Sequence, residues 1–174
     1  MNIFAKIIRL KDYQFRKVKY FTVHFDDSQV NEFFDFLNRM EDMEEVIEDL
    51  LNLNAWIEEI GENYGAIKSR FFRNESIFAD VQGLPPPRKQ MVAHEVIVEN
   101  MRLYCMVMNE HVVFLFNGGI KTTAKAQDCP NVGQYIKQAN MLVQKIDELL
   151  KTREISWNKF QTDIEFDENL EIEI

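Results

Sequence analysis

The fold of this chain is decided by residues 101–116, which read MRLYCMVMNEHVVFLF. Two apolar runs, Met101–Met108 and His111–Phe116, are rich in the β-branched and aromatic residues that favour strands. Only the pair Asn109-Glu110 separates them, and a two-residue break of this kind is the spacing of a tight β-hairpin. The stretch therefore predicts two antiparallel strands joined by a short turn.

The sequence before this hairpin predicts a further strand. Val92–Val98 is a third apolar run, and the two-residue break Glu99-Asn100 separates it from the hairpin, so we expect an antiparallel meander that ends at Gly118-Gly119. Ahead of the meander, residues 83–87 read GLPPP. They predict an extended loop, because consecutive prolines fit neither a helix nor the hydrogen-bond ladder of a sheet.

Two amphipathic helices are predicted before the meander. Residues 30–37 place apolar side chains at the i, i+3, i+4 and i+7 positions of a helix, and the side chains of residues 26–28 can cap its first N–H groups. A second helix near residues 43–61 combines an apolar stripe with a face of carboxylates, which we interpret as a solvated surface. The two helices together predict a helical hairpin.

The two ends of the chain predict further elements. Tyr20–Phe25 is typical of a strand, and Ile3–Leu10 indicates a weaker one before it. Cys129-Pro130 opens a third helix, whose apolar stripe covers residues 132–150. From Asp163 onwards apolar and acidic residues alternate, so we expect the tail to dock as an added strand, on its own sheet or on a second copy of the chain.

The expected fold class is α+β, with an N-terminal helical hairpin packed on an antiparallel β-sheet meander and followed by a C-terminal helix. The 174 residues of the chain have the length of one compact domain. Residues 28–152 would form this α+β domain, residues 1–27 an N-terminal strand extension, and residues 153–174 an acidic C-terminal tail.

Charge is strongly segregated along the chain, whose net charge is −9. Residues 1–20 carry six bases and one acid, whereas residues 21–64 carry thirteen acids and a single base, Arg39. This acidic balance disfavours a nucleic-acid partner, although a local basic face remains open. No apolar run has the length of a membrane helix and no secretory signal is recognisable, so we expect a cytoplasmic protein without membrane association.

Signatures of common catalytic chemistry are missing from the sequence. The three histidines are scattered and fit no metal-binding motif. Cys105 is expected in the core, and no base can be assigned to Cys129, although a reactive thiol needs a lowered pKa. The glycine-containing segment 118–123 lacks the spacing of a phosphate-binding loop. We therefore expect neither a metal nor an organic cofactor.

The segments around the predicted hairpin occur in a recognisable order. Residues 100–105 read NMRLYC, residues 112–123 read VVFLFNGGIKTT, and an alanine-containing helix follows around Ala139. This order resembles the RelE/HigB superfamily of toxin–antitoxin ribonucleases, in whose HigB-like members an Arg-hydrophobic-Tyr strand precedes a strand closed by a glycine and a lysine-threonine pair. The loop Gly83-Leu84-Pro85 is similar to the short glycine-containing loop ahead of that family's sheet. The resemblance covers residues 28–150.

The resemblance implies a metal-independent RNA endonuclease that cleaves mRNA as part of a toxin–antitoxin system. Arg102 would contact the scissile phosphate, Lys121 would supply a second basic group after the final strand, and Tyr104 would assist on the same sheet face as Arg102. Positioned cations of this kind stabilise the charge that develops in the transition state. The implied partners are an antitoxin protein and RNA or the ribosome.

A second hypothesis keeps the fold without the catalysis. Residues 95–99 contain no lysine where the RelE branch places its general acid/base lysines, and no C-terminal His or Tyr is placed for catalysis. The acidic chain would also approach RNA against electrostatic repulsion. These departures favour a non-catalytic protein-interaction module on the same fold, and they leave a homodimer open.

Overall fold

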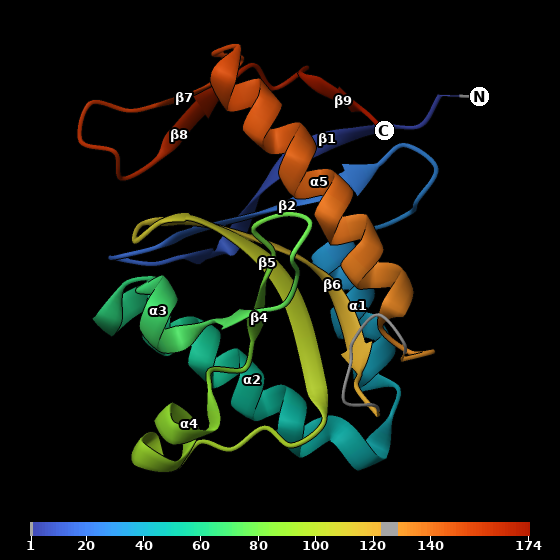
Figure 1. The fold of residues 1–174 in the computed structure, drawn as a ribbon, viewed down its shortest axis with the longest axis vertical. Helices are drawn as coiled ribbons and strands as arrows, with labels where there is room; N and C mark the ends of the chain where they lie inside the picture. Colours follow the sequence, from blue (N-terminus) through green and yellow to red (C-terminus); the bar gives the residue numbers. More distant parts are fainter. Residues whose placement is uncertain (1, 123–128) are drawn as a thin grey trace.

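The computed structural model describes residues 2–122 and 129–174. Its centre is a mixed sheet with the strand order β3-β4-β5-β6-β2-β1-β9, and helices lie on both faces (Figure 1). The strands of this sheet are β1 (Phe4–Gln14), β2 (Lys19–Phe25), β3 (Arg73–Asn74), β4 (Gln82–Leu84), β5 (Met101–Asn109), β6 (Val112–Ile120) and β9 (Glu171–Glu173).

The helices are α1 (Glu32–Glu41), α2 (Ile47–Glu59), α3 (Lys68–Phe71), α4 (Arg88–His94) and α5 (Gly133–Lys151). A short 3-10 turn, η1 (Glu44–Val46), leads into α2, and a π-helical turn, η2 (Ile60–Tyr64), follows it. Two further strands, β7 (Ile155–Trp157) and β8 (Ile164–Phe166), form a separate antiparallel pair.

The chain enters the sheet through a β-hairpin, which corrects the predicted fold class. β1 and β2 pair antiparallel, with Ala5 opposite Phe25, before the first helix begins. β2 then pairs in parallel with β6, and Lys19 lies opposite Val112. The prediction of an N-terminal helical hairpin on an antiparallel meander is therefore wrong, because a hairpin comes first and the sheet is mixed. A parallel pair needs a long crossover, and this one has no local sequence signature.

The predicted strand Val92–Val98 is also wrong. Residues 88–94 form α4, which ends at Glu95 in the left-handed conformation with a φ of 58°. β4 takes the place beside β5 instead, so that Leu84 lies opposite Leu103. The predicted extended loop therefore begins only after Leu84. Short apolar runs do not distinguish strands from helices, which explains the error.

α1 begins later than predicted. Its N-cap is Asn31, whose side-chain oxygen accepts a 2.8 Å hydrogen bond from the N–H of Phe34, and residues 26–28 play no part in the cap. Phe33 and Phe36 are fully buried, while Phe34 is 39% exposed. The buried stripe is thus rotated relative to the predicted one. α2 and α5 confirm the two other predicted helices, although α5 begins at Gly133.

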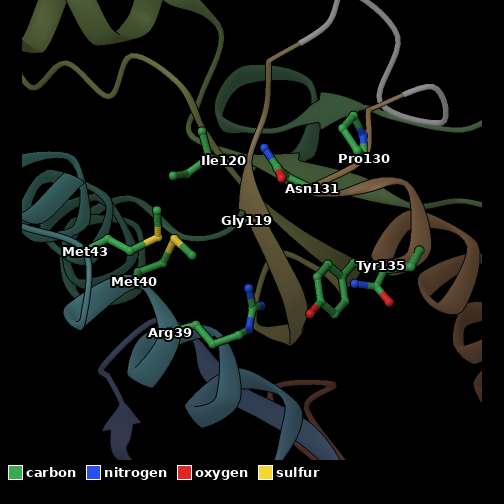
Figure 2. Close-up of a pocket in the computed structure, with 9 residues that line it drawn as sticks. Arg39, Met40, Met43, Gly119, Ile120, Pro130, Asn131 and Tyr135 are labelled. Carbon is green, nitrogen blue, oxygen red and sulfur yellow. The ribbon is translucent and has the colours of Figure 1, made fainter. Parts of the chain in front are cut away.

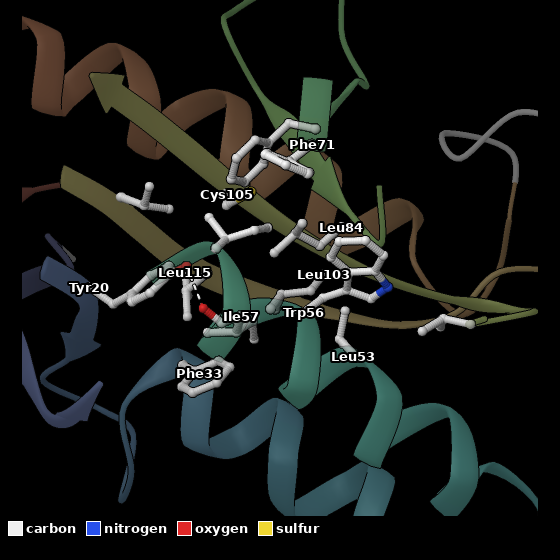
Figure 3. Packing of buried hydrophobic residues seen from close by; sticks show 14 of the residues in the cluster. Tyr20, Phe33, Leu53, Trp56, Ile57, Phe71, Leu84, Leu103, Cys105 and Leu115 are labelled. Atoms are coloured by element: carbon white, nitrogen blue, oxygen red, sulfur yellow. Dashed lines mark hydrogen bonds between the residues drawn. The ribbon is translucent and has the colours of Figure 1, made fainter. Parts of the chain in front are cut away.

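Two apolar cores lie on opposite faces of the sheet. α1 and α2 cover one face, where Trp56, Phe71 and Leu103 belong to one buried cluster (Figure 3). α5 covers the other face, with Ile136 among the residues buried there. Successive side chains of a strand point to opposite faces, so Leu103 belongs to the first core and Tyr104 to the second. Both faces of β5 are therefore covered.

The last part of the C-terminal tail confirms the prediction of an added strand, whereas Ile164–Phe166 pairs with β7 in the separate two-stranded sheet. β9 pairs antiparallel with β1, where Ile172 lies opposite Ala5 and is 2% exposed. The N–H of Ile174 donates a further hydrogen bond of 2.8 Å to the carbonyl of Ile3. The tail therefore extends its own sheet at the edge opposite β3.

Candidate functional site

Arg102 is enclosed by the fold. It lies on the same face of β5 as Tyr104, the face that α5 covers. Its Nε atom is 3.4 Å from Oε1 of Glu75, and the two side chains are 11% and 9% exposed. Nη1 donates a 3.1 Å hydrogen bond to the carbonyl of Met101. The guanidinium is therefore paired with a carboxylate and presents little surface to a phosphate.

Tyr104 is fully buried two residues further along β5. Within the described part of the chain, its hydroxyl has no hydrogen-bond partner. Burial, reinforced by the Glu75 carboxylate, raises the pKa of Tyr104 far above that of a free phenol. The hydroxyl is therefore neutral at physiological pH.

Lys121 follows β6 directly and is half-buried. Its backbone N–H donates a 2.6 Å hydrogen bond to the carbonyl of Asn100, while Gly119, two residues earlier, pairs with Arg102. The three residues predicted from the family resemblance thus lie at one end of β5 and β6. No hydrogen bond or ion pair between described residues joins the Lys121 side chain to Arg102 or Tyr104. Thr123, the last residue of the matched motif, lies outside the described residues.

A second arginine, Arg39, is held in place by α1 and β6. Its Nε donates a 3.0 Å hydrogen bond to Asp35, one turn earlier on α1. Nη2 donates to the carbonyl of Gly118 at 2.7 Å and to the side-chain oxygen of Asn117. The guanidinium carbon lies 4.7 Å from the ring centroid of Tyr135 on α5. Four groups from three elements therefore fix the orientation of this guanidinium.

Asn117 connects this arginine to two carboxylates. Its Nδ2 donates to Glu32 at 2.8 Å and to Asp35 at 2.9 Å, and its Oδ1 also accepts from the N–H of Gly118. Glu32 is 7% exposed, and burial raises the pKa of its carboxyl group. This buried network joins α1 to the distal half of β6.

A cavity of about 260 Å³ opens beside Arg39. Figure 2 shows the guanidinium and the Tyr135 ring on one side of it, with Met40, Met43 and Ile120 on another. Nη1 of Arg39 donates no hydrogen bond to the described residues, so it can donate to a carbonyl or carboxylate placed in the cavity. Sequence reasoning missed this site, although Arg39 is the only base among residues 21–64.

Cys129 lies just before α5 and is 2% exposed. Its Sγ atom is 3.4 Å from both the backbone nitrogen and the hydroxyl of Thr122. Burial raises the pKa of the thiol, but hydrogen bonds from Thr122 and from the backbones of Asn131 and Val132 outweigh it and lower the pKa to about 6. This environment could not be read from the sequence, because Thr122 and Cys129 meet only through the fold.

The comparisons with protein-family models, curated proteins and solved structures found no match for this chain. In the part of the chain that the structure describes, no group of three or more His, Cys, Asp or Glu residues is placed to hold a metal ion. None of the described helices is long and apolar enough to cross a membrane.

Proposed function

We propose that this protein is a non-catalytic binding module that recognises a basic protein through the outer face of α2 and its flanking turns. The observation that carries the proposal is a long acidic segment without compensating bases. Residues 40–67 contain nine acidic residues and neither lysine nor arginine. Most of these carboxylates are exposed, namely Glu41, Asp42, Glu44, Glu45, Glu48, Glu58, Glu59 and Glu62.

The acidic surface has an apolar centre. Leu51 is 66% exposed and lies on α2 three residues after Glu48 and seven before Glu58, so these side chains share one helix face. Among the described ion pairs, only the one between Arg16 and Glu62 neutralises a carboxylate of the segment. An exposed leucine surrounded by unneutralised carboxylates suits a partner with an apolar contact and a basic rim.

The charge distribution also sets the class of partner. A surface of this sign attracts a basic protein and accelerates its association, and it repels the phosphates of RNA. Burying an exposed leucine contributes about 1.5–3 kcal/mol, whereas each surface ion pair contributes about 0–1 kcal/mol. We therefore expect the carboxylates to determine specificity and rate, and Leu51 to supply much of the affinity.

RNA cleavage is supported less well by the geometry. Arg102 is paired with Glu75 on a sheet face that α5 covers, and Tyr104 is fully buried. The endonuclease activity that the RelE/HigB resemblance implies stays a prediction. Expression followed by mapping of mRNA ends tests it: cleavage that Arg102→Ala abolishes would overturn the non-catalytic proposal.

Charge reversal tests the binding surface directly. The variant Glu45→Lys/Glu48→Lys/Glu58→Lys changes three exposed carboxylates of the acidic face. Its matched control, Glu165→Lys/Glu168→Lys/Glu173→Lys, changes three exposed carboxylates near the C-terminus and has the same net charge. We expect crosslinking in cells to capture one discrete basic protein with the wild type and the control, and to lose it with the first variant. Equal capture by both variants, or equal loss, would overturn the proposal.

A further inference from the structure

The cavity between α2 and α4 has aromatic walls. Its volume is about 380 Å³, and the residues that line it are Ala55, Trp56, Glu59, Tyr64, His94 and Val96. The His94 ring lies edge-on to Trp56 and Tyr64, with centroid distances of 5.2 and 5.4 Å. This cavity adjoins the acidic surface formed by residues 40–67, because Glu59 belongs to both.

The polar atoms of Trp56 and Tyr64, and Nδ1 of His94, are used within the protein. Trp56 Nε1 donates a 2.8 Å hydrogen bond to the carbonyl of Val96, and the Tyr64 hydroxyl lies 3.4 Å from Nδ1 of His94. What the walls offer to a ligand is therefore Nε2 of His94 and the π-electron faces of the rings. Such faces carry partial negative charge and attract cations.

Glu59 adds a full negative charge to the cavity. One of its oxygens accepts a 2.9 Å hydrogen bond from Asn63, and no described base forms an ion pair with it. The neighbouring aromatic cluster already holds a guanidinium, because Arg70 lies 4.7 Å from the Phe71 centroid and Phe71 stacks on Tyr64. The guanidinium carbon of Arg70 also lies 5.7 Å from the ring centroid of Tyr64, which is one of the cavity walls.

We propose that this cavity receives an arginine side chain of the basic partner. A planar guanidinium can stack on the aromatic walls while it donates hydrogen bonds to Glu59. An acidic side chain would be repelled by Glu59, and a neutral apolar one would partly desolvate that carboxylate without donating a hydrogen bond to it. This inference rests on the proposed function for the source of the arginine, but the cavity can be tested without the partner.

Fluorescence of Trp56 provides the test. Trp157 in β7 is the only other tryptophan, so Trp157→Phe leaves Trp56 as the sole indole. The probe is N-acetyl-arginine amide, and its uncharged counterpart of similar shape is N-acetyl-citrulline amide. We expect a saturable change of Trp56 emission with the arginine probe alone. No saturable change, or an equal change with citrulline, would overturn the inference.

Two neighbouring glutamates provide a matched pair of variants. Glu59→Gln removes the charge that lines the cavity. We expect it to lower the affinity for the arginine probe about fivefold, which corresponds to the upper end of the range for one exposed ion pair. Glu58→Gln removes the adjacent exposed charge outside the cavity and should change binding much less. Equal weakening by both variants would show a general field effect and overturn the specific role of Glu59.

The failures of the two proposals are distinguishable. If the arginine probe binds but charge reversal on α2 does not affect capture in cells, the cavity inference stands and the proposed function fails. If capture depends on α2 but Trp56 does not respond to the probe, the proposed function stands and the cavity inference fails.

Discussion

The guanidinium of Arg102 and the carboxylate of Glu75 form an ion pair in the interior, with Nε and Oε1 3.4 Å apart and side chains 11% and 9% exposed. Glu75 follows the edge strand β3, and its backbone N–H donates to the carbonyl of Val81. A Cβ atom at Gly83 would lie 2.5 Å from the same carboxylate, so a larger residue there would displace the Glu75 side chain. The pair therefore joins the edge of the sheet to β5.

The first prediction concerns this ion pair. Glu75→Met leaves the Arg102 charge buried without this carboxylate and should lower the free energy of unfolding by about 3–5 kcal/mol. Arg102→Met removes the other half of the pair and should also destabilise the protein. The double substitution removes both charges and should cost much less than the sum of the two. Urea denaturation of the four proteins measures the difference, and strict additivity would contradict the coupling.

The second prediction compares two buried tyrosines. Tyr104→Phe removes a hydroxyl that has no partner among the described residues, so it should leave stability unchanged or increase it. Tyr20→Phe removes a 2.8 Å hydrogen bond to the carbonyl of Ile57 and should cost about 1 kcal/mol. Urea denaturation tests the contrast: where the m-value is unchanged, the shift of the midpoint from that of the wild type measures the change in stability of each variant. If Tyr104→Phe were the more costly change, its hydroxyl would have a structural or functional partner.

The third prediction concerns the orientation of Arg39. Arg39→Lys keeps the charge but cannot donate to Asp35, Asn117 and Gly118 together, so it should cost about 1–3 kcal/mol. Arg9→Lys is the matched control, because Arg9 pairs with Asp163 at the surface, where such pairs contribute about 0–1 kcal/mol. Thermal unfolding of both variants tests this. Equal and small losses of stability in the two variants would mean that the hydrogen bonds of Arg39 contribute no more to stability than a surface ion pair does.

The fourth prediction is a pH dependence. Burial raises the pKa of Glu32 above its ordinary value of 4.5, so the folded state binds this proton more tightly than the unfolded chain does. Its contribution to stability therefore falls as the pH rises from about 4.5 through the raised folded value. Glu32→Gln keeps an oxygen for Asn117 and removes the titration.

We expect the stability of Glu32→Gln relative to the wild type to increase with pH across this window. The measurement is urea denaturation of both proteins from pH 4 to 7, and the exposed neighbour on α1, Glu41→Gln, is the control. A difference between Glu32→Gln and the wild type that stays constant with pH would contradict the prediction.

Local patterns in the sequence were sufficient for several elements. β-branched and aromatic residues predicted β2, and alternation predicted the tail strand β9. Helical periodicity predicted α2 and α5, and the break at Asn109-Glu110 predicted the β5–β6 hairpin. These signals are local, because an element with one buried face repeats its apolar residues at its own period. The run Val92–Val98 was too short for that signal and was assigned wrongly.

The surroundings of Arg102 and Arg39 could not be predicted from local sequence patterns. Arg102 and Tyr104 were predicted to be catalytic groups from a family resemblance, but a residue's burial depends on what covers its strand, here α5. Arg39 drew no attention, because its partner Asn117 lies 78 residues away.

The sequence alone thus determined the types of the longer strands and helices and the acidic character of residues 21–64, since both depend on neighbouring residues. Only the tertiary structure decided that β2 joins β6 in parallel, that Glu75 neutralises Arg102, and that Trp56, Tyr64 and His94 enclose a cavity. The physical reason is the same in each case. Long-range contacts are selected by the packing of whole faces against one another, and no short stretch of residues encodes that choice.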